Sequence, residues 1–179
     1  TGGDDGKCKK GTGSMADMHW MEQRRSNIIK EIVHTETTFC LMLRTVVEQV
    51  LEPLRHGAAI PDLSEQDIAT VFNNIDAIYA LSTELNTALA GLSGGDLSAA
   101  SVGAVFLQVG KSFDIYKTYC AGYHRANDLV LKMEQDRHPF VAWYTEQLLR
   151  GAPDAYKKFK ISSFLITPVQ RLPRYKMLL

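Results

Sequence analysis

The chain has 179 residues, enough for one domain with a sizeable hydrophobic core. Twenty basic residues balance twenty acidic ones, so net charge does not point to nucleic acid or an anionic membrane as the main partner. A hydrophobic content of 45% favours a folded domain, and no apolar run approaches the roughly 20 residues of a membrane span. Three widely spaced cysteines, Cys8, Cys40 and Cys120, form no disulfide or zinc pattern, which favours a reducing cytosolic setting.

Residues 1–16 are rich in glycine and charge and are interpreted as a flexible tail, part of which, before Met15, can be vector-derived. Residues 17–179 are interpreted as one domain. From about residue 17 to 54 the apolar residues recur at helical spacing, which predicts one long helix. The residues of its apolar stripe are Ile28, Ile29, Ile32, Val33, Phe39, Cys40, Leu43, Val46, Val47, Val50 and Leu51.

Glu36 lies at the centre of that apolar stripe. Burying an unpaired carboxylate costs several kcal/mol, so two interpretations stay open. Either Glu36 forms an internal salt bridge, with Arg171 or Arg174 as candidate partners, or this part of the stripe is open to a binding partner. The second interpretation predicts that Glu36→Ala leaves the fold intact.

The rest of the chain predicts an all-α protein. A break over 57–61 precedes a second helix that Ser64 and Asp67 cap, and a Gly/Ser-rich connection covers 91–101. Neither an alternating strand pattern nor an internal repeat appears, which favours an elongated bundle of about six helices. The further helices are expected over residues 64–92, 102–133, 139–151 and from 167 onward, with a short packed piece from 153.

Conventional catalytic chemistry has no visible machinery in this sequence. The five histidines are scattered, without the H-E-x-x-H spacing of a zinc site. Neither a G-x-S-x-G nucleophile motif nor a cysteine–histidine pairing stands out. The sequence therefore predicts no catalytic residue, no metal site and no cofactor.

The last stretch carries a helix start signal. Thr167 fits an N-cap, Pro168 the first helical position, and Gln170 lies in capping-box register. Pro173 stands inside the same pattern, where proline costs ~3 kcal/mol. Gln170 and Arg174 are four residues apart and project from one face.

Residues 164–179, FLITPVQRLPRYKMLL, resemble the third signature block of Dbl-homology (DH) domains, the exchange module of Rho-family guanine nucleotide exchange factors. That block reads roughly L-x-x-P-x-Q-R-x-x-[RK]-Y-x-L-L-L, and Met177 stands where leucine is usual. Residues 25–43, R-x-x-I-I-x-E-I-V-x-T-E-x-x-F-x-x-x-L, resemble the first block, and a weaker likeness lies in the third helix. The resemblance spans roughly residues 22–179.

The resemblance implies release of GDP from a Rho-family small GTPase, without covalent chemistry, by contacts to both switch regions. It implies that Glu36 holds the first switch and that Gln170 and Arg174 hold the second. The alternative is a helical scaffold or regulatory module that binds a protein partner without promoting exchange. In that case Gln170 only completes a capping box and Arg174 only pairs with Glu36.

The resemblance also implies that the chain stops at Leu179 inside the third block and lacks the C-terminal helices of a DH domain. Met177–Leu179 are then apolar residues at a chain end, where residues are normally polar. An apolar surface left in this way predicts a fragment that forms dimers or aggregates. Recruitment to membranes is expected through other domains.

Overall fold

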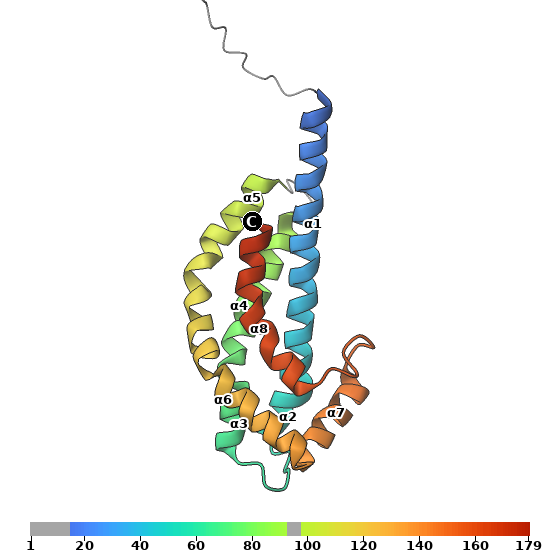
Figure 1. Cartoon of the computed structure of the whole chain (residues 1–179), viewed down its shortest axis with the longest axis vertical. Helices are drawn as coiled ribbons and strands as arrows, with labels where there is room; N and C mark the ends of the chain where they lie inside the picture. Colours follow the sequence, from blue (N-terminus) through green and yellow to red (C-terminus); the bar gives the residue numbers. More distant parts are fainter. Residues whose placement is uncertain (1–14, 93–97) are drawn as a thin grey trace, which may run out of the picture.

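The computed structural model describes residues 15–92 and 98–179, so residues 1–14 of the tail expected over residues 1–16 lie outside the described part, and the last two residues of that expected tail are helical. Within that part every regular element is a helix, and together they form the elongated bundle shown in Figure 1. The expected all-α fold is confirmed. The α-helices are α1 Met15–Val46, α2 Glu52–Arg55, α3 Glu65–Phe72, α4 Ile75–Leu92, α5 Ala99–Val109, α6 Ile115–Gln135, α7 Pro139–Gly151 and α8 Ile161–Leu178.

The predicted long first helix is present with one irregularity. Helix α1 passes into a π-helical segment, Val47–Leu51, which passes directly into α2. The chain then turns at Gly57, whose φ of 97° is a conformation that glycine adopts at low cost. The nine members of the apolar stripe other than Ile28 and Val33 are buried, and those two pack against the core.

The second predicted helix begins where expected but is divided in two. Ser64 and Asp67 form a capping box, with 3.1 Å bonds from the Asp67 amide to Ser64 Oγ and from the Ser64 amide to Asp67 Oδ2. Helix α3 ends at Asn73, where φ is 48°. The Asn73 and Asn74 side chains donate to the carbonyl oxygens of Thr118 and Ile115 on α6. These long-range bonds favour a break that local spacing did not reveal.

Removing the cap hydroxyl with Ser64→Ala should lower the free energy of unfolding by about 1 kcal/mol. The hydroxyl and amide of Ser64 hold the pKa of Asp67 below its ordinary value of 3.8. The stabilisation is therefore present above pH 3.8 and is lost as the pH falls through the folded-state pKa. Urea unfolding at neutral and acidic pH measures both effects. Ser163→Ala, at an exposed position inside α8, is the control and should not destabilise.

The third predicted helix is unbroken along the chain but varies in winding. A 3-10 segment, Gly110–Asp114, joins α5 to α6. The α7 boundaries, Pro139 and Gly151, match the expected ones, and the His138 side chain caps its start by accepting from the Phe140 amide. Taking continuous rods together, the described residues form six helical rods, as expected.

The expected start of the last helix at Thr167 is wrong, because α8 begins six residues earlier at Ile161. Pro168 therefore lies inside the helix and cannot donate to the carbonyl of Phe164. The Thr167 hydroxyl donates to that carbonyl instead, at 2.8 Å. The feature interpreted as an N-cap is a side chain that satisfies a carbonyl freed by proline.

Helix α1 packs along α4, and α8 packs along α6, with the N-terminal turns of α1 projecting beyond the other helices (Figure 1). The core lies between these rods. Among the described helices none is both long and apolar enough to cross a membrane. This arrangement sets the middle of α1 beside α8, and these two helices carry the residues of interest.

Candidate functional site

Glu36 lies in the core at 0% exposure, with a hydrogen-bond partner on each of two other helices. Its Oε2 accepts from Arg171 Nε at 3.1 Å and Nη2 at 2.5 Å, and from the Tyr175 hydroxyl at 2.5 Å. Its Oε1 accepts from the Ser82 hydroxyl at 2.6 Å. The carboxylate thus joins α1, α4 and α8.

The electrostatics of this cluster favour a charged guanidinium beside a neutral phenol. Burial, and then the Glu36 carboxylate, raise the pKa of Tyr175 far above its ordinary value of 10.0, so its hydroxyl stays a donor. Burial acts to lower the pKa of Arg171, but Tyr175 and Glu36 raise it by more. The guanidinium carbon also lies 5.1 Å from the ring centre of Phe39 and 4.5 Å from that of Tyr175.

The direct partner contact expected of Glu36 stays a prediction, and in this structure the carboxylate is buried. Its carboxylate has no exposed surface, and its hydrogen-bonding capacity is taken up inside the bundle. The internal salt bridge is the interpretation that the geometry supports, and of the two candidate partners it is Arg171 that forms it. Arg174 does not contact Glu36.

Gln170 and Arg174 are both exposed on α8. Gln170 lies inside the helix, so it completes no capping box. Arg174 Nη2 is 3.8 Å from Glu31 Oε1, and the two side chains are 48% and 53% exposed. At that exposure the pair contributes less than about 1 kcal/mol, so both side chains can exchange this contact for another.

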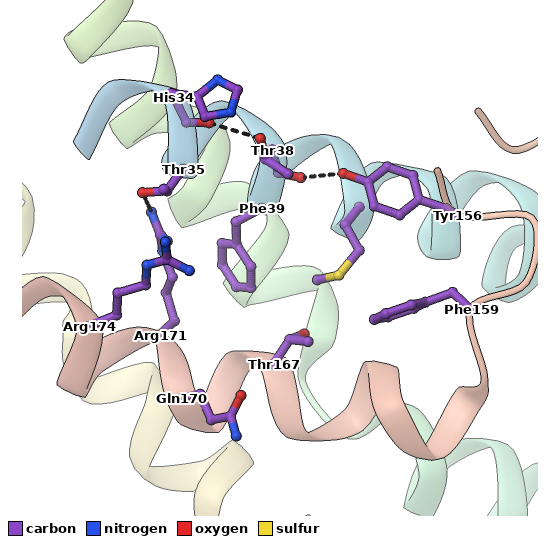
Figure 2. A pocket seen from close by; sticks show the side chains of 11 residues that line it. His34, Thr35, Thr38, Phe39, Tyr156, Phe159, Thr167, Gln170, Arg171 and Arg174 are labelled. Carbon is purple, nitrogen blue, oxygen red and sulfur yellow. Dashed lines mark hydrogen bonds between the residues drawn. The ribbon is translucent and has the colours of Figure 1, made fainter. Parts of the chain in front are cut away.

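Gln170 and Arg174 form a ridge between two grooves, because both residues line both of them. One groove, of about 420 Å³, lies between α1, α8 and the 152–160 segment, and Figure 2 shows Arg171 and Arg174 reaching across it from α8 toward α1. The other groove, of about 630 Å³, lies on the Glu31 side. The first is lined by His34, Thr35, Thr38, Phe39, Met42, Tyr156, Phe159, Thr167, Gln170, Arg171 and Arg174. The second is lined by Glu31, Val169, Gln170, Pro173, Arg174, Met177 and Leu178.

Sequence reasoning did not single out Glu31. Glu31 and Glu36 lie five positions apart on α1, one exposed and one buried. The exposed acidic residue of this surface is therefore Glu31.

The surface formed by Glu31, Gln170 and Arg174, called here the α1–α8 surface, is suited to protein recognition. It offers an anion, an amide and a cation beside two open grooves, without a nucleophile and base in contact. The described cysteines Cys40 and Cys120 are free, and the described residues contain no group of three or more potential metal ligands. Exposed charged and amide side chains beside grooves can bind complementary groups on another protein.

Comparison with known proteins places the chain in a family. A family model described as the RhoGEF domain matches residues 28–179. Mouse "Pleckstrin homology domain-containing family G member 2" is 35% identical over 159 residues, covering 87% of this chain and 11% of that protein. Mouse "Rho guanine nucleotide exchange factor 38" is 28% identical over 169 residues, covering 89% and 21%. The chain thus spans only a small part of the relatives it matches.

Solved structures show the same fold. A structure of the Vav1 exchange factor aligns with a TM-score of 0.74 at 23% identity over 88% of this chain and 40% of that one. The DH/PH domains of p115-RhoGEF align with a TM-score of 0.74 at 18% identity, covering 88% and 45%. Because the family model covers most of the residues and its fold is the one observed, the chain belongs to the RhoGEF (DH) domain family.

Proposed function

We propose that this chain promotes release of GDP from a Rho-family small GTPase and that the α1–α8 surface makes the contact. The observation that carries the proposal is the ridge of Gln170 and Arg174, exposed between two grooves and held beside Glu31. Membership of the RhoGEF family supports the partner class. No covalent bond is made or broken in nucleotide release, in keeping with a surface of recognition residues.

The mechanism follows from linkage between two binding equilibria. A protein that binds the nucleotide-free GTPase more tightly than the loaded one must weaken nucleotide binding by the same factor. In our proposal Gln170 and Arg174 bind the second switch region, as the resemblance implies. Glu36 binds the first switch region, as the resemblance implies, by exchanging one of its internal bonds for a bond to the GTPase, and Glu31 flanks the contact on the same surface at 53% exposure.

Release of fluorescent GDP from a panel of Rho-family GTPases tests the proposal directly. We expect at least one GTPase to release nucleotide faster with the chain present than without it. A chain that binds a GTPase but leaves its release rate unchanged across the panel would act as a scaffold, which contradicts the exchange proposal. As a control, EDTA is added to each GTPase without the chain. EDTA removes Mg²⁺, and the fluorescent GDP should then be released.

We also propose that the isolated chain self-associates. Exposed apolar side chains at both ends of the described helices support this proposal: Met15, Met18, Trp20, Met21, Met177 and Leu179. Light scattering should give a mass above that of the 20.0 kDa chain, rising with concentration. A constant mass equal to one chain would contradict it.

The cellular setting that we propose is cytosolic, with recruitment to membranes through other domains of a longer protein. The free thiols of Cys40 and Cys120 support a reducing setting. Fluorescence microscopy should find the tagged chain diffuse in the cytosol, and enrichment of this chain at a membrane would contradict the need for other domains.

A further inference from the structure

Two prolines lie inside helix α8, and each deprives one backbone carbonyl of its usual donor. Proline has no amide hydrogen, so the carbonyl four residues earlier loses its helical hydrogen bond, and the proline ring crowds that carbonyl. The affected carbonyls are those of Phe164, opposite Pro168, and Val169, opposite Pro173. Each needs another donor or water, because a backbone carbonyl shielded from both is costly.

The two carbonyls differ in how they are satisfied. Pro168 is buried, and the carbonyl opposite it accepts from the Thr167 hydroxyl at 2.8 Å. Pro173 is exposed, and within residues 15–92 and 98–179 no side chain donates to the Val169 carbonyl. The inner gap is thus closed by the domain itself, whereas the outer gap is open at the surface.

The open gap lies in the second groove of the α1–α8 surface. Val169 and Pro173 line this groove of about 630 Å³ together with Gln170 and Arg174. The free carbonyl is therefore beside the two side chains to which we assign the second switch region. Arg174 offers only donors to a partner, and the Val169 carbonyl adds a main-chain acceptor next to them.

Pro173 is not explained by the stability of the domain. Proline inside a helix is strongly unfavourable relative to alanine. The ring of Pro173 is exposed, so it contributes little to the core. A residue that weakens its own helix without adding to the core is better explained by what it does for a partner.

We infer that the Val169 carbonyl accepts a hydrogen bond from the GTPase and that Pro173 keeps this carbonyl available. The donor that fits is a peptide N–H of the second switch region, in a stretch outside regular secondary structure where the amide has no partner of its own. An amide at position 173 would occupy the same acceptor from within the helix. The inference rests on the proposed exchange function.

Pro173→Ala supplies that competing amide. The variant should melt at a higher temperature than the unmodified chain, because α8 gains a hydrogen bond and a residue of high helix propensity. It should nevertheless release GDP roughly tenfold more slowly, the equivalent of about 1.4 kcal/mol and the size of one hydrogen bond. A higher melting temperature with unchanged GDP release would mean that the proline is only tolerated, and the inference would fail.

Pro168→Ala is the matched control. It makes the same change in the same helix, but the Phe164 carbonyl already has a donor and Pro168 lines neither groove. GDP release, assayed below the melting temperature, should be unchanged. A slowing as large as that of Pro173→Ala would show that the added helical amide acts through the shape of α8 and not through the Val169 carbonyl, which contradicts the inference.

Lactic acid in place of Pro173 separates the effect of the amide from the loss of the ring. This residue has neither a ring nor an N–H, so the Val169 carbonyl stays free while any contact made by the ring is lost. A synthetic peptide ending at Leu179 can carry it. We expect GDP release close to the unmodified rate. Release as slow as that of Pro173→Ala would assign the effect to the ring and overturn the inference.

The same measurements distinguish this inference from the proposal on which it rests. Failure of the unmodified chain to release GDP from every GTPase of the panel contradicts the proposed function and this inference with it. Fast release by the unmodified chain that is equally fast with Pro173→Ala contradicts the inference alone.

Discussion

Glu36→Ala should destabilise the domain by about 3–5 kcal/mol, a large share of the 5–15 kcal/mol that holds a typical domain folded. The substitution leaves the Arg171 guanidinium buried beside no anion, and it removes the acceptor for the Tyr175 and Ser82 hydroxyls. Thermal unfolding followed by circular dichroism measures the loss. The interpretation of Glu36 as a residue open to a binding partner predicts the opposite outcome, in which Glu36→Ala leaves the fold intact.

Glu31→Ala is the matched control for Glu36→Ala. It removes the same side chain from the same helix, but the Glu31 carboxylate is 53% exposed and its ion pair with Arg174 spans 3.8 Å. Exposed pairs of this kind contribute less than about 1 kcal/mol. Equal melting temperatures for Glu36→Ala and the unmodified chain would contradict the buried ion pair.

Removing both charges of the Glu36–Arg171 pair should destabilise the domain less than removing the Glu36 carboxylate alone. In Glu36→Ala combined with Arg171→Met no unpaired charge remains in the core, and an apolar side chain fills the guanidinium's place. The double variant should therefore be more stable than Glu36→Ala alone. If it is less stable than Glu36→Ala, the cost of the single variant comes from lost packing and not from a stranded charge.

Arg174→Ala should have the largest effect on GTPase binding while leaving the fold nearly unchanged. Loss of a charge-assisted hydrogen bond to the partner corresponds to about 1–3 kcal/mol of affinity. Arg174 is 48% exposed, so the domain itself loses little. Arg174→Lys should keep most activity, since the family pattern that the chain resembles accepts lysine or arginine at this position.

Arg150→Ala controls for the general loss of a surface arginine. Arg150 lies on α7, pairs with Glu146 and is 69% exposed, but it lines neither groove of the α1–α8 surface. The Arg150→Ala variant should bind the GTPase as tightly as the unmodified chain does. A strong loss with Arg174→Lys would indicate a two-nitrogen guanidinium contact, and no loss with Arg174→Ala would remove Arg174 from the proposed contact.

Helical spacing and caps predicted most of the fold because they are local. The apolar stripe of α1, the Ser64 capping box and the Pro139 start of α7 each depend on residues within a few positions. The break after α3 depends on bonds from Asn73 and Asn74 to residues more than 40 positions away. The start of α8 at Ile161 was not predicted, because the capping rule considers only neighbouring residues. A Thr–Pro pair fits that rule both at the start of a helix and inside one.

The candidate site was predictable in part for the same reason. Gln170 and Arg174 share a face by spacing alone, and the structure places both on one exposed ridge. Glu36 was correctly recognised as anomalous, but its partner Arg171 lies 135 positions away and had to compete with Arg174 as a candidate. Which of the two arginines pairs with Glu36 depends on how α8 packs against α1, and local spacing does not determine that packing.

The most direct test of the exchange proposal is the affinity of this chain for one GTPase in two states, nucleotide-free and GDP-loaded with Mg²⁺. Linkage requires that a chain which speeds release by weakening nucleotide binding prefers the nucleotide-free form. We predict a markedly lower Kd for the nucleotide-free GTPase by titration calorimetry, and we predict that Arg174→Ala raises that Kd. Equal Kd values for the two states would contradict exchange by this surface and would leave a protein that binds its partner without acting on its nucleotide.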